Sequence, residues 1–165
     1  MFRTRRLEFV PVTREAAEAV IAGELSALAV ADGWPHADTR DALRGVALGA
    51  EVWLVLLDGA VIGDCGTHGP VDADGVVEIG YGIAEPVRGR GFGNEIAAGL
   101  ADHLAARPEV RCIVANDVRA DNVPSRRALE NAGFSLIDET NETASYARPS
   151  DGQRATSRSG SESSA

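Results

Sequence analysis

The spacing of apolar residues near the start of the chain predicts a strand followed by helices. Leu7 and residues 9–12 form a short strand pattern that ends near Pro11. Thr13 can then cap a helix that runs through Ala22. Helical spacing predicts two further short helices, over residues 24–31 and 38–48. The loop 32–36 separates them because its glycine and proline interrupt the periodicity.

The middle of the chain has the pattern of an antiparallel meander. Residues 52–57 form a continuous apolar run, and a second run begins at Val61. Asp58-Gly59 between these runs is a strong signal for a tight hairpin turn. A polar turn then leads to a third strand over residues 76–83, where glycines allow a bulge or a close backbone approach.

Helices and strands continue to the end of the apolar pattern. Ile96, Leu100 and Leu104 recur every four residues, which predicts a helix over residues 94–106 with one stripe packed on the sheet. The remaining pattern predicts a buried strand, a second helix with Pro124 in its first turn, and two final strands. These elements cover residues 110–115, 122–131, 134–137 and 142–147, respectively.

Composition separates one folded domain from a tail. The 165-residue chain has the length of a single domain, which we place at residues 1–148. Residues 149–165 are rich in Ser, Gly and Arg and contain no apolar anchor, so we expect a disordered tail. Cys65 and Cys112 are far apart in apolar stretches and are expected to be free, buried thiols.

Charge and hydropathy exclude several classes of function. The net charge of −9 argues against binding to nucleic acid or to an anionic membrane. We find no apolar run of membrane-spanning length and no signal-peptide core, so we expect a soluble cytoplasmic protein. The chain contains no lysine, which excludes a lysine nucleophile or Schiff base. The three histidines have no partner at metal-ligand spacing, so no metal is expected.

Glycines and arginines gather where the third strand of the meander meets the next helix. Gly89, Gly91 and Gly93 let the backbone turn sharply, and the helix that follows offers unpaired amides. Arg88 and Arg90 add donors suited to phosphate. This segment is predicted to cradle a pyrophosphate. Its position after an antiparallel meander disfavours a dinucleotide-binding βαβ unit.

Two motifs in the right order resemble the GNAT superfamily of N-acetyltransferases. The first is Arg88-x-x-Gly91-x-Gly93 after the Gly80-Tyr81 strand, and the second is the segment 122–134, which ends in Gly-Phe. Within the superfamily, the chain is most similar to the branch that contains ribosomal-protein N-terminal alanine and serine acetyltransferases. The resemblance implies an α+β, three-layer α/β/α domain. Its mixed, mostly antiparallel sheet would have about six to seven strands with helices on both faces.

The resemblance implies acetyl-CoA as the co-substrate and assigns its binding residues. Backbone amides of the glycine loop would hold the pyrophosphate, the end of the third meander strand would pair with pantetheine, and Asn122 would contact the pantetheine arm. The cofactor residues implied in this way are Tyr81, Gly82, Ile83, Arg88, Gly89, Arg90, Gly91, Phe92, Gly93, Asn94, Asn122 and Arg127.

Two residues are candidates for proton transfer. Glu78 stands in an apolar strand just before the loop and could act as the general base, although it could equally be a solvent-facing strand residue. Many members of the superfamily protonate the CoA thiolate with a tyrosine, but this chain has Leu129 at that place. Attention therefore moves to Ser125, which could also simply bond to its own helix backbone.

The loop 32–36 is the candidate wall of the acceptor site, with Trp34 and His36 as its binding residues. The expected reaction is direct attack of a primary amine, from a small molecule or a protein N-terminus, on acetyl-CoA. A non-catalytic acyl-CoA sensor or partner-binding module of the same fold is the alternative, because the usual tyrosine is missing. A homodimer is compatible with either reading.

Overall fold

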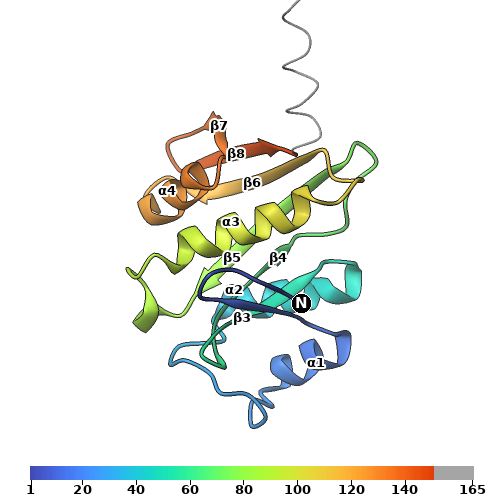
Figure 1. The fold of residues 1–165 in the computed structure, drawn as a ribbon, viewed down its shortest axis with the longest axis vertical. Helices are drawn as coiled ribbons and strands as arrows, with labels where there is room; N and C mark the ends of the chain where they lie inside the picture. The colour runs from blue at the N-terminus through green and yellow to red at the C-terminus, as the bar shows by residue number, and fades with distance from the viewer. Residues whose placement is uncertain (151–165) are drawn as a thin grey trace, which may run out of the picture.

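A mixed sheet of eight strands runs through residues 1–150, which are the part of the chain that the computed structural model describes (Figure 1). The strand order is β1-β2-β3-β4-β5-β6-β8-β7, and all neighbours are antiparallel except β5 and β6. The strands are β1 Phe2–Arg3, β2 Glu8–Pro11, β3 Val52–Leu57, β4 Ala60–Thr67, β5 Val76–Ile83, β6 Cys112–Arg119, β7 Ser135–Glu139 and β8 Thr143–Pro149.

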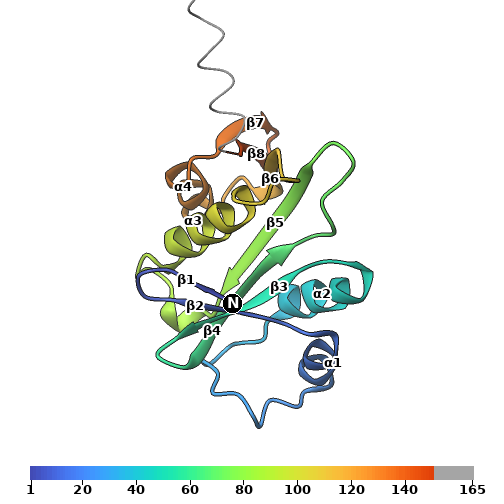
Figure 2. The same cartoon turned by 45° about the vertical axis from the view of Figure 1, so that its right-hand side comes forward.

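Helices cover both faces of this sheet (Figure 2). Helices α1 (Arg14–Ala22) and α2 (Ala37–Gly45) pack on one face, and α3 (Phe92–Ala105) and α4 (Val123–Asn131) pack on the other. Side chains of β3 alternate between the two cores, with Val55 in the core beneath α3 and Leu54 in the core beneath α1 and α2. The three-layer prediction is confirmed, with slightly more strands than expected.

The structure confirms several predictions of local structure. The Thr13 hydroxyl accepts a hydrogen bond from the amide of Ala16 and caps α1. Asp58 and Gly59 both adopt positive φ, at 51° and 82°, which is the geometry of the predicted tight hairpin. The helix predicted over residues 38–48 is confirmed as α2 followed by the 3₁₀ turn η1 (Val46–Leu48).

The helix predicted over residues 24–31 is wrong. Gly23 ends α1 in the left-handed conformation, with φ at 86°, and the chain then runs along β4. The amide of Ala31 donates to the carbonyl of Val61, and the amide of Val61 donates to the carbonyl of Ala29. These backbone groups pair with a strand, so they are not available for a helix.

The parallel strands β5 and β6 diverge toward their carboxyl ends. They pair only from Val76 to Glu78 on β5, although β5 continues to Ile83. Beyond Glu78, β5 pairs with β4 alone, and β6 pairs with β8. The opening between the two strands therefore lies where α3 and α4 begin (Figure 1).

The end of the described chain reaches into the segment that we expected to be a tail. Pro149 belongs to β8, and Ser150 is buried, with its amide bonded to the carbonyl of Arg111. The remaining tail, residues 151–165, lies outside the described residues. Within residues 1–150, none of the helices is both long and apolar enough to cross a membrane.

Candidate functional site

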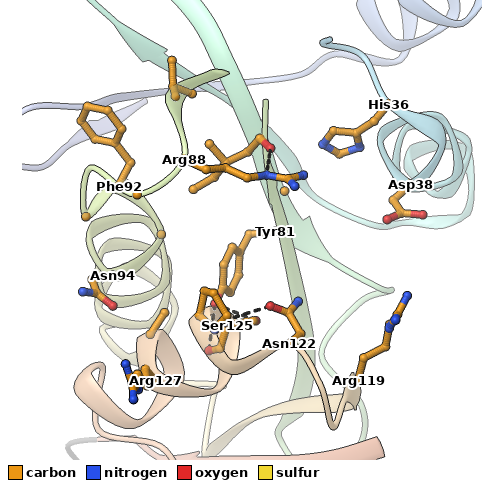
Figure 3. A pocket seen from close by; sticks show the side chains of 18 of the residues that line it. His36, Asp38, Tyr81, Arg88, Phe92, Asn94, Arg119, Asn122, Ser125 and Arg127 are labelled. Carbon is orange, nitrogen blue, oxygen red and sulfur yellow. Dashed lines mark hydrogen bonds between the residues drawn. The ribbon is translucent and has the colours of Figure 1, made fainter. Parts of the chain in front are cut away.

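A cavity of about 940 Å³ lies at the opening between β5 and β6. This volume is at the upper end of the range for small-molecule sites. Four segments line it: the loop into α3, the end of β5, the start of α2, and the segment from β6 into α4 (Figure 3). The site therefore combines both motifs of the second half of the chain with one segment of the first half.

The loop into α3 presents its backbone to the cavity. Gly89 and Gly91 have φ of 77° and 78°, a conformation that side chains rarely adopt. Gly91 is the N-cap residue of α3 and makes no side-chain cap bond, so the first amides of this helix are open to a ligand. No atom lies within 4 Å of where a Cβ of Gly89 would stand. Backbone donors at a helix start are suited to phosphate.

The arginines of this loop have different roles. Arg88 lines the cavity, and its Nε donates to the carbonyl of Ile83 at 3.1 Å. The side chain of Arg90 instead lies over the ring of Phe92, 5.1 Å from its centroid, and is not among the cavity residues. Arg127 on α4 supplies a second cationic side chain to the lining. The part of the cavity between α3 and α4 is therefore suited to a polyanionic ligand.

The amino-terminal segment holds the loop in place. Glu95 in the first turn of α3 accepts hydrogen bonds from the Thr4 hydroxyl at 2.6 Å and from Arg6, through both its amide and its Nε. Arg6 also donates to the carbonyl of Arg90. Burial opposes ionisation of Glu95, but these hydrogen bonds lower its pKa. Sequence reasoning missed this clamp, because it joins residues about ninety positions apart.

The start of α4 forms the wall opposite the loop. Asn122 caps this helix, and its side-chain oxygen accepts a hydrogen bond from the amide of Ser125. The Ser125 hydroxyl lies 3.0 Å from the hydroxyl of Tyr81, which also donates to the Ser125 carbonyl. Burial raises the pKa of Tyr81, and the bond to Ser125 opposes the shift. Figure 3 shows these three side chains close together beside β5.

Polar groups of both signs line the other side of the cavity. His36 and Asp38 come from the start of α2, Arg119 is the last residue of β6, and Asp121 follows that strand. Arg119 and Asp121 pair with each other at 2.6 Å, and both side chains are exposed. Sequence reasoning had found only His36 here. Asp38, Arg119 and Asp121 lie in segments without a recognisable motif, so nothing in the sequence singled them out.

Trp34 is buried behind this wall and does not reach the cavity. Only 4% of its surface is exposed, and its indole Nε1 donates to the carboxylate of Asp64 at 2.7 Å. Asp64 on β4 also accepts from the Thr39 hydroxyl at 2.5 Å. Burial raises the pKa of Asp64, while the bonds from Thr39 and Trp34 oppose the shift. Trp34 therefore supports this wall of the cavity from within the core.

Glu78 lies away from the cavity lining. Its carboxylate is 3.0 Å from Nδ1 of His68, whose ring is exposed. A Cβ on Gly80, which has the same side-chain direction on β5, would meet this His68 ring. Of the two candidates for proton transfer, Ser125 therefore lines the cavity and Glu78 does not.

The structure brings most of the predicted residues together. Eleven of the twelve implied cofactor residues line the cavity, and Arg90 is the exception. Of the predicted acceptor residues, only His36 does so. Among residues 1–150, no group of three or more His, Cys, Asp and Glu side chains is arranged to hold a metal ion. The lining residues that sequence reasoning missed are Ala37, Asp38, Val87, Arg119, Asp121, Pro124, Ala128 and Asn131.

Comparisons with known proteins agree with this geometry. Residues 6–135 match the model of the acetyltransferase (GNAT) domain family. The uncharacterized N-acetyltransferase YjdG of Bacillus subtilis (strain 168) is 28% identical over 114 residues, which cover 62% of this chain and 67% of that protein. The resemblance to the superfamily that the two motifs predicted is confirmed.

Solved structures of acetyltransferases share the fold. RimL, a ribosomal L7/L12 α-N-protein acetyltransferase in complex with coenzyme A, has a TM-score of 0.66 and 20% identity, covering 90% of this chain and 96% of that one. The microcin C7 self-immunity acetyltransferase MccE, in complex with acetyl-CoA and AMP, has a TM-score of 0.62 and 14% identity, covering 88% and 93%.

Proposed function

The chain belongs to the GNAT acetyltransferase family, and we propose that it transfers the acetyl group of acetyl-CoA to a primary amine by direct attack within a ternary complex. The observation that carries this proposal is the glycine loop of α3, which opens its backbone amides to a cavity of sufficient volume. The CoA- and acetyl-CoA-bound structural neighbours support the same co-substrate.

The residues around the cavity fit acetyl-CoA in charge and shape. Left-handed glycines and the free start of α3 suit its pyrophosphate, and Arg88 and Arg127 suit its phosphates. The end of β5 beyond Glu78 has no strand partner on its β6 side, so its backbone groups there are available to pantetheine, apart from the Ile83 carbonyl that accepts from Arg88. Acetyl-CoA supplies an activated acyl carbon, and these residues would hold it beside the opening between the strands.

The α4 start is the part of the site nearest to a leaving thiolate in this proposal. The Ser125 hydroxyl, already bonded to Tyr81, can donate to a developing negative charge. Leu129, at the place of the usual family tyrosine, is buried in the core and has no proton to give. Ser125, with Tyr81 behind it, is therefore our candidate for stabilising the thiolate.

The acceptor in this proposal is an amine that enters from the side of α2. On that side the Arg119–Asp121 pair balances its own charge, and Asp38 beside His36 adds a further carboxylate, which favours a cationic acceptor. Ribosomal-protein N-terminal acetyltransferases among the structural neighbours make a protein N-terminus a reasonable acceptor, together with small-molecule amines.

A transfer assay tests the proposed function. Purified protein is incubated with acetyl-CoA and a panel of amines that includes peptides with free N-termini, and both CoA thiol release and acetylated product are measured. We expect product to form at the same rate as thiol. Tight acetyl-CoA binding without product on any acceptor would favour the non-catalytic sensor and refute the enzyme.

A further inference from the structure

The turn between β1 and β2, residues 4–7, lies against the start of α3 (Figure 2). The amide of Thr4 donates to the carbonyl of Leu7 and closes this turn. The Thr4 hydroxyl and both the amide and the Nε of Arg6 donate to Glu95 in the first turn of α3. A turn that only joined two strands would need none of these contacts to a helix about ninety positions away.

Helix α3 carries a glycine where the turn lies against it. Gly99 follows Glu95 by four positions, so both residues lie on the same side of the helix. A Cβ on Gly99 would stand 2.6 Å from Cγ2 of Thr4 and 3.4 Å from the ring of Phe9. Glycine is unfavourable inside a helix relative to alanine, but any side chain here would push the turn away. Gly99 therefore permits the turn to lie directly on α3.

The guanidinium group of Arg6 reaches from this turn to the glycine loop. Its Nη1 donates to the carbonyl of Arg90 at 3.1 Å, and its Nε donates to Glu95 at 2.6 Å. A Cβ on Gly91 would stand 3.6 Å from Nη2 of Arg6. The Cζ atom of Arg6 also lies 4.4 Å from the ring centroid of Phe92. One planar group with several donors thus contacts the loop and the first turn of α3 at once.

The bond from Arg6 fixes the orientation of the peptide group between Arg90 and Gly91. In a trans peptide the carbonyl and the amide point in opposite directions. The Arg90 carbonyl is directed to Arg6, so the Gly91 amide is directed away from it. Gly91 lines the cavity and Arg90 does not, which places the amide on the cavity side. Within residues 1–150, no backbone carbonyl accepts a hydrogen bond from this amide, so it is open to a ligand.

Glycine at position 91 does not by itself fix this orientation. Gly91 has φ of 78°, and glycine populates positive and negative φ about equally well. Rotation of the peptide group would turn the Arg90 carbonyl toward the cavity and place its partial negative charge against a phosphate. The donor side of the peptide faces the ligand only while another group holds the carbonyl, and Arg6 supplies that restraint.

Arg6 also compensates the charge of Glu95. A carboxylate in the first turn stabilises a helix, but it repels an anionic ligand that binds at the same helix end. The side chains of Glu95 and Arg6 are only 14% and 34% exposed, so water screens this repulsion incompletely. Their ion pair at 2.6 Å removes most of the negative charge and leaves the amide donors of α3 to the ligand.

We propose that Arg6 is a positioning residue for acetyl-CoA, which holds the Gly91 amide toward the pyrophosphate and compensates the Glu95 carboxylate beside it. This proposal rests on the proposed function for the identity of the ligand. Arg6 is not among the residues that line the cavity, and it lies at the glycine loop, away from Ser125 on α4. It should therefore set the affinity for acetyl-CoA and leave the chemical step unchanged.

Calorimetry of acetyl-CoA binding to the full chain tests this role without any acceptor. Arg6→Met removes the donors and the charge, and it should weaken binding by at least about tenfold, the contribution of one hydrogen bond to a charged group. Arg5→Met removes the same charge from the adjacent, exposed position and should stay within about twofold of wild type. Gly99→Ala keeps every charged group but displaces the turn, so it should also weaken binding. It tests the proposal even if Arg6→Met does not fold.

Kinetics with two acetyl donors separate positioning from a general loss of structure. Arg6→Met should raise KM for acetyl-CoA by at least about tenfold and leave kcat within about twofold. S-acetylpantetheine has no pyrophosphate, so its kcat/KM should be the same in Arg6→Met and wild type. An equal loss with both donors would indicate damage to the fold and overturn the positioning role.

The conservative variant Arg6→Lys separates charge from geometry. Lysine keeps the positive charge but lacks the planar fork that reaches both Glu95 and the Arg90 carbonyl. It should therefore recover only part of the affinity that Arg6→Met loses. Complete recovery would assign the effect to charge alone and overturn the role in peptide orientation.

The proposal and the proposed function fail in different ways. Wild-type acetyl-CoA affinity in both Arg6→Met and Gly99→Ala would overturn the role of Arg6 and leave the proposed function intact. A wild-type protein that binds acetyl-CoA but transfers no acetyl group would refute the proposed function, and the calorimetry would still decide the role of Arg6.

Discussion

Substitution of Gly82 by alanine perturbs His36, which lines the cavity, through a single methyl group. The backbone of Gly82 has no positive φ, so alanine fits the strand conformation without strain. Its methyl group would stand 2.5 Å from Nε2 of His36. Ordinary contact requires about 3.5 Å, so the ring must move by about 1 Å. His36 lies on the side of the cavity where we propose that the acceptor enters, and a displacement of this size there should lower the rate by about 100-fold, or about 2.7 kcal/mol in the barrier.

Gly80→Ala is the matched control on the same strand. The new methyl group would stand 2.6 Å from Nε2 of His68, an almost identical clash. The His68 ring is exposed and can swing into solvent, so we expect kcat within about twofold of wild type, as for a surface residue outside the site. The pair of variants compares the two histidines with the chemical change and the strand held constant.

The assay is steady-state acetyl transfer, measured together with acetyl-CoA affinity by calorimetry. Gly82→Ala should lower kcat and leave the affinity nearly unchanged, because pantetheine would contact the backbone of β5. In a His36→Ala background, the same Gly82→Ala change should have little further effect, since the clashing ring is gone. A loss of activity in Gly80→Ala but not in Gly82→Ala would refute the reasoning and point to the His68–Glu78 pair.

Three further predictions concern stability. Glu95→Gln should be less stable than wild type at pH 7 in urea unfolding, because the pKa of Glu95 is lower in the folded state than its ordinary value of 4.5. This stabilisation is present above pH 4.5 and is lost as the pH falls through the folded pKa. An equal difference between the two proteins at acid and neutral pH would contradict this prediction. Leu100→Ala should cost about 2–5 kcal/mol in the same assay, since Leu100 is fully buried on the face of α3 that packs on the sheet, and a cost near zero would contradict that packing. Thr13→Ala should cost about 1 kcal/mol by removing the N-cap of α1, whereas Thr13→Ser keeps a capping hydroxyl and should cost little; equal costs would contradict the cap.

The glycine-loop side of the cavity could be predicted because its determinants are local in sequence. The glycine loop, the capping Asn122 and the strand before the loop each carry their geometry in a few neighbouring residues. The conformation of Gly91 at φ of 78° is the kind of position that only glycine readily fills. A strand-to-helix turn with these residues leaves little choice of backbone path, so eleven of the twelve implied residues line the cavity.

The α2 side of the cavity could not be predicted because it depends on contacts between distant residues. The Thr39 hydroxyl bonds to Asp64, which lies 25 positions further along the chain. The ring of His36, at the start of α2, lies over Gly82 on β5. The segment 24–31 shows the same limit, since its helical spacing is overridden by backbone pairing with β4. Trp34 was expected in the acceptor site, but burial against Asp64 directs it into the core.

Calorimetry of acetyl-CoA binding to two glycine variants tests the central claim most directly. Gly91→Asp places a carboxylate at the start of α3, whereas Gly23→Asp makes the same change at φ of 86° at the end of α1, outside the cavity lining. Both variants bear the same backbone strain. The account predicts that Gly91→Asp weakens acetyl-CoA binding by at least about tenfold, or about 1.4 kcal/mol, and that Gly23→Asp binds like wild type. Equal affinity in the two variants would contradict the assignment of this cavity to acetyl-CoA.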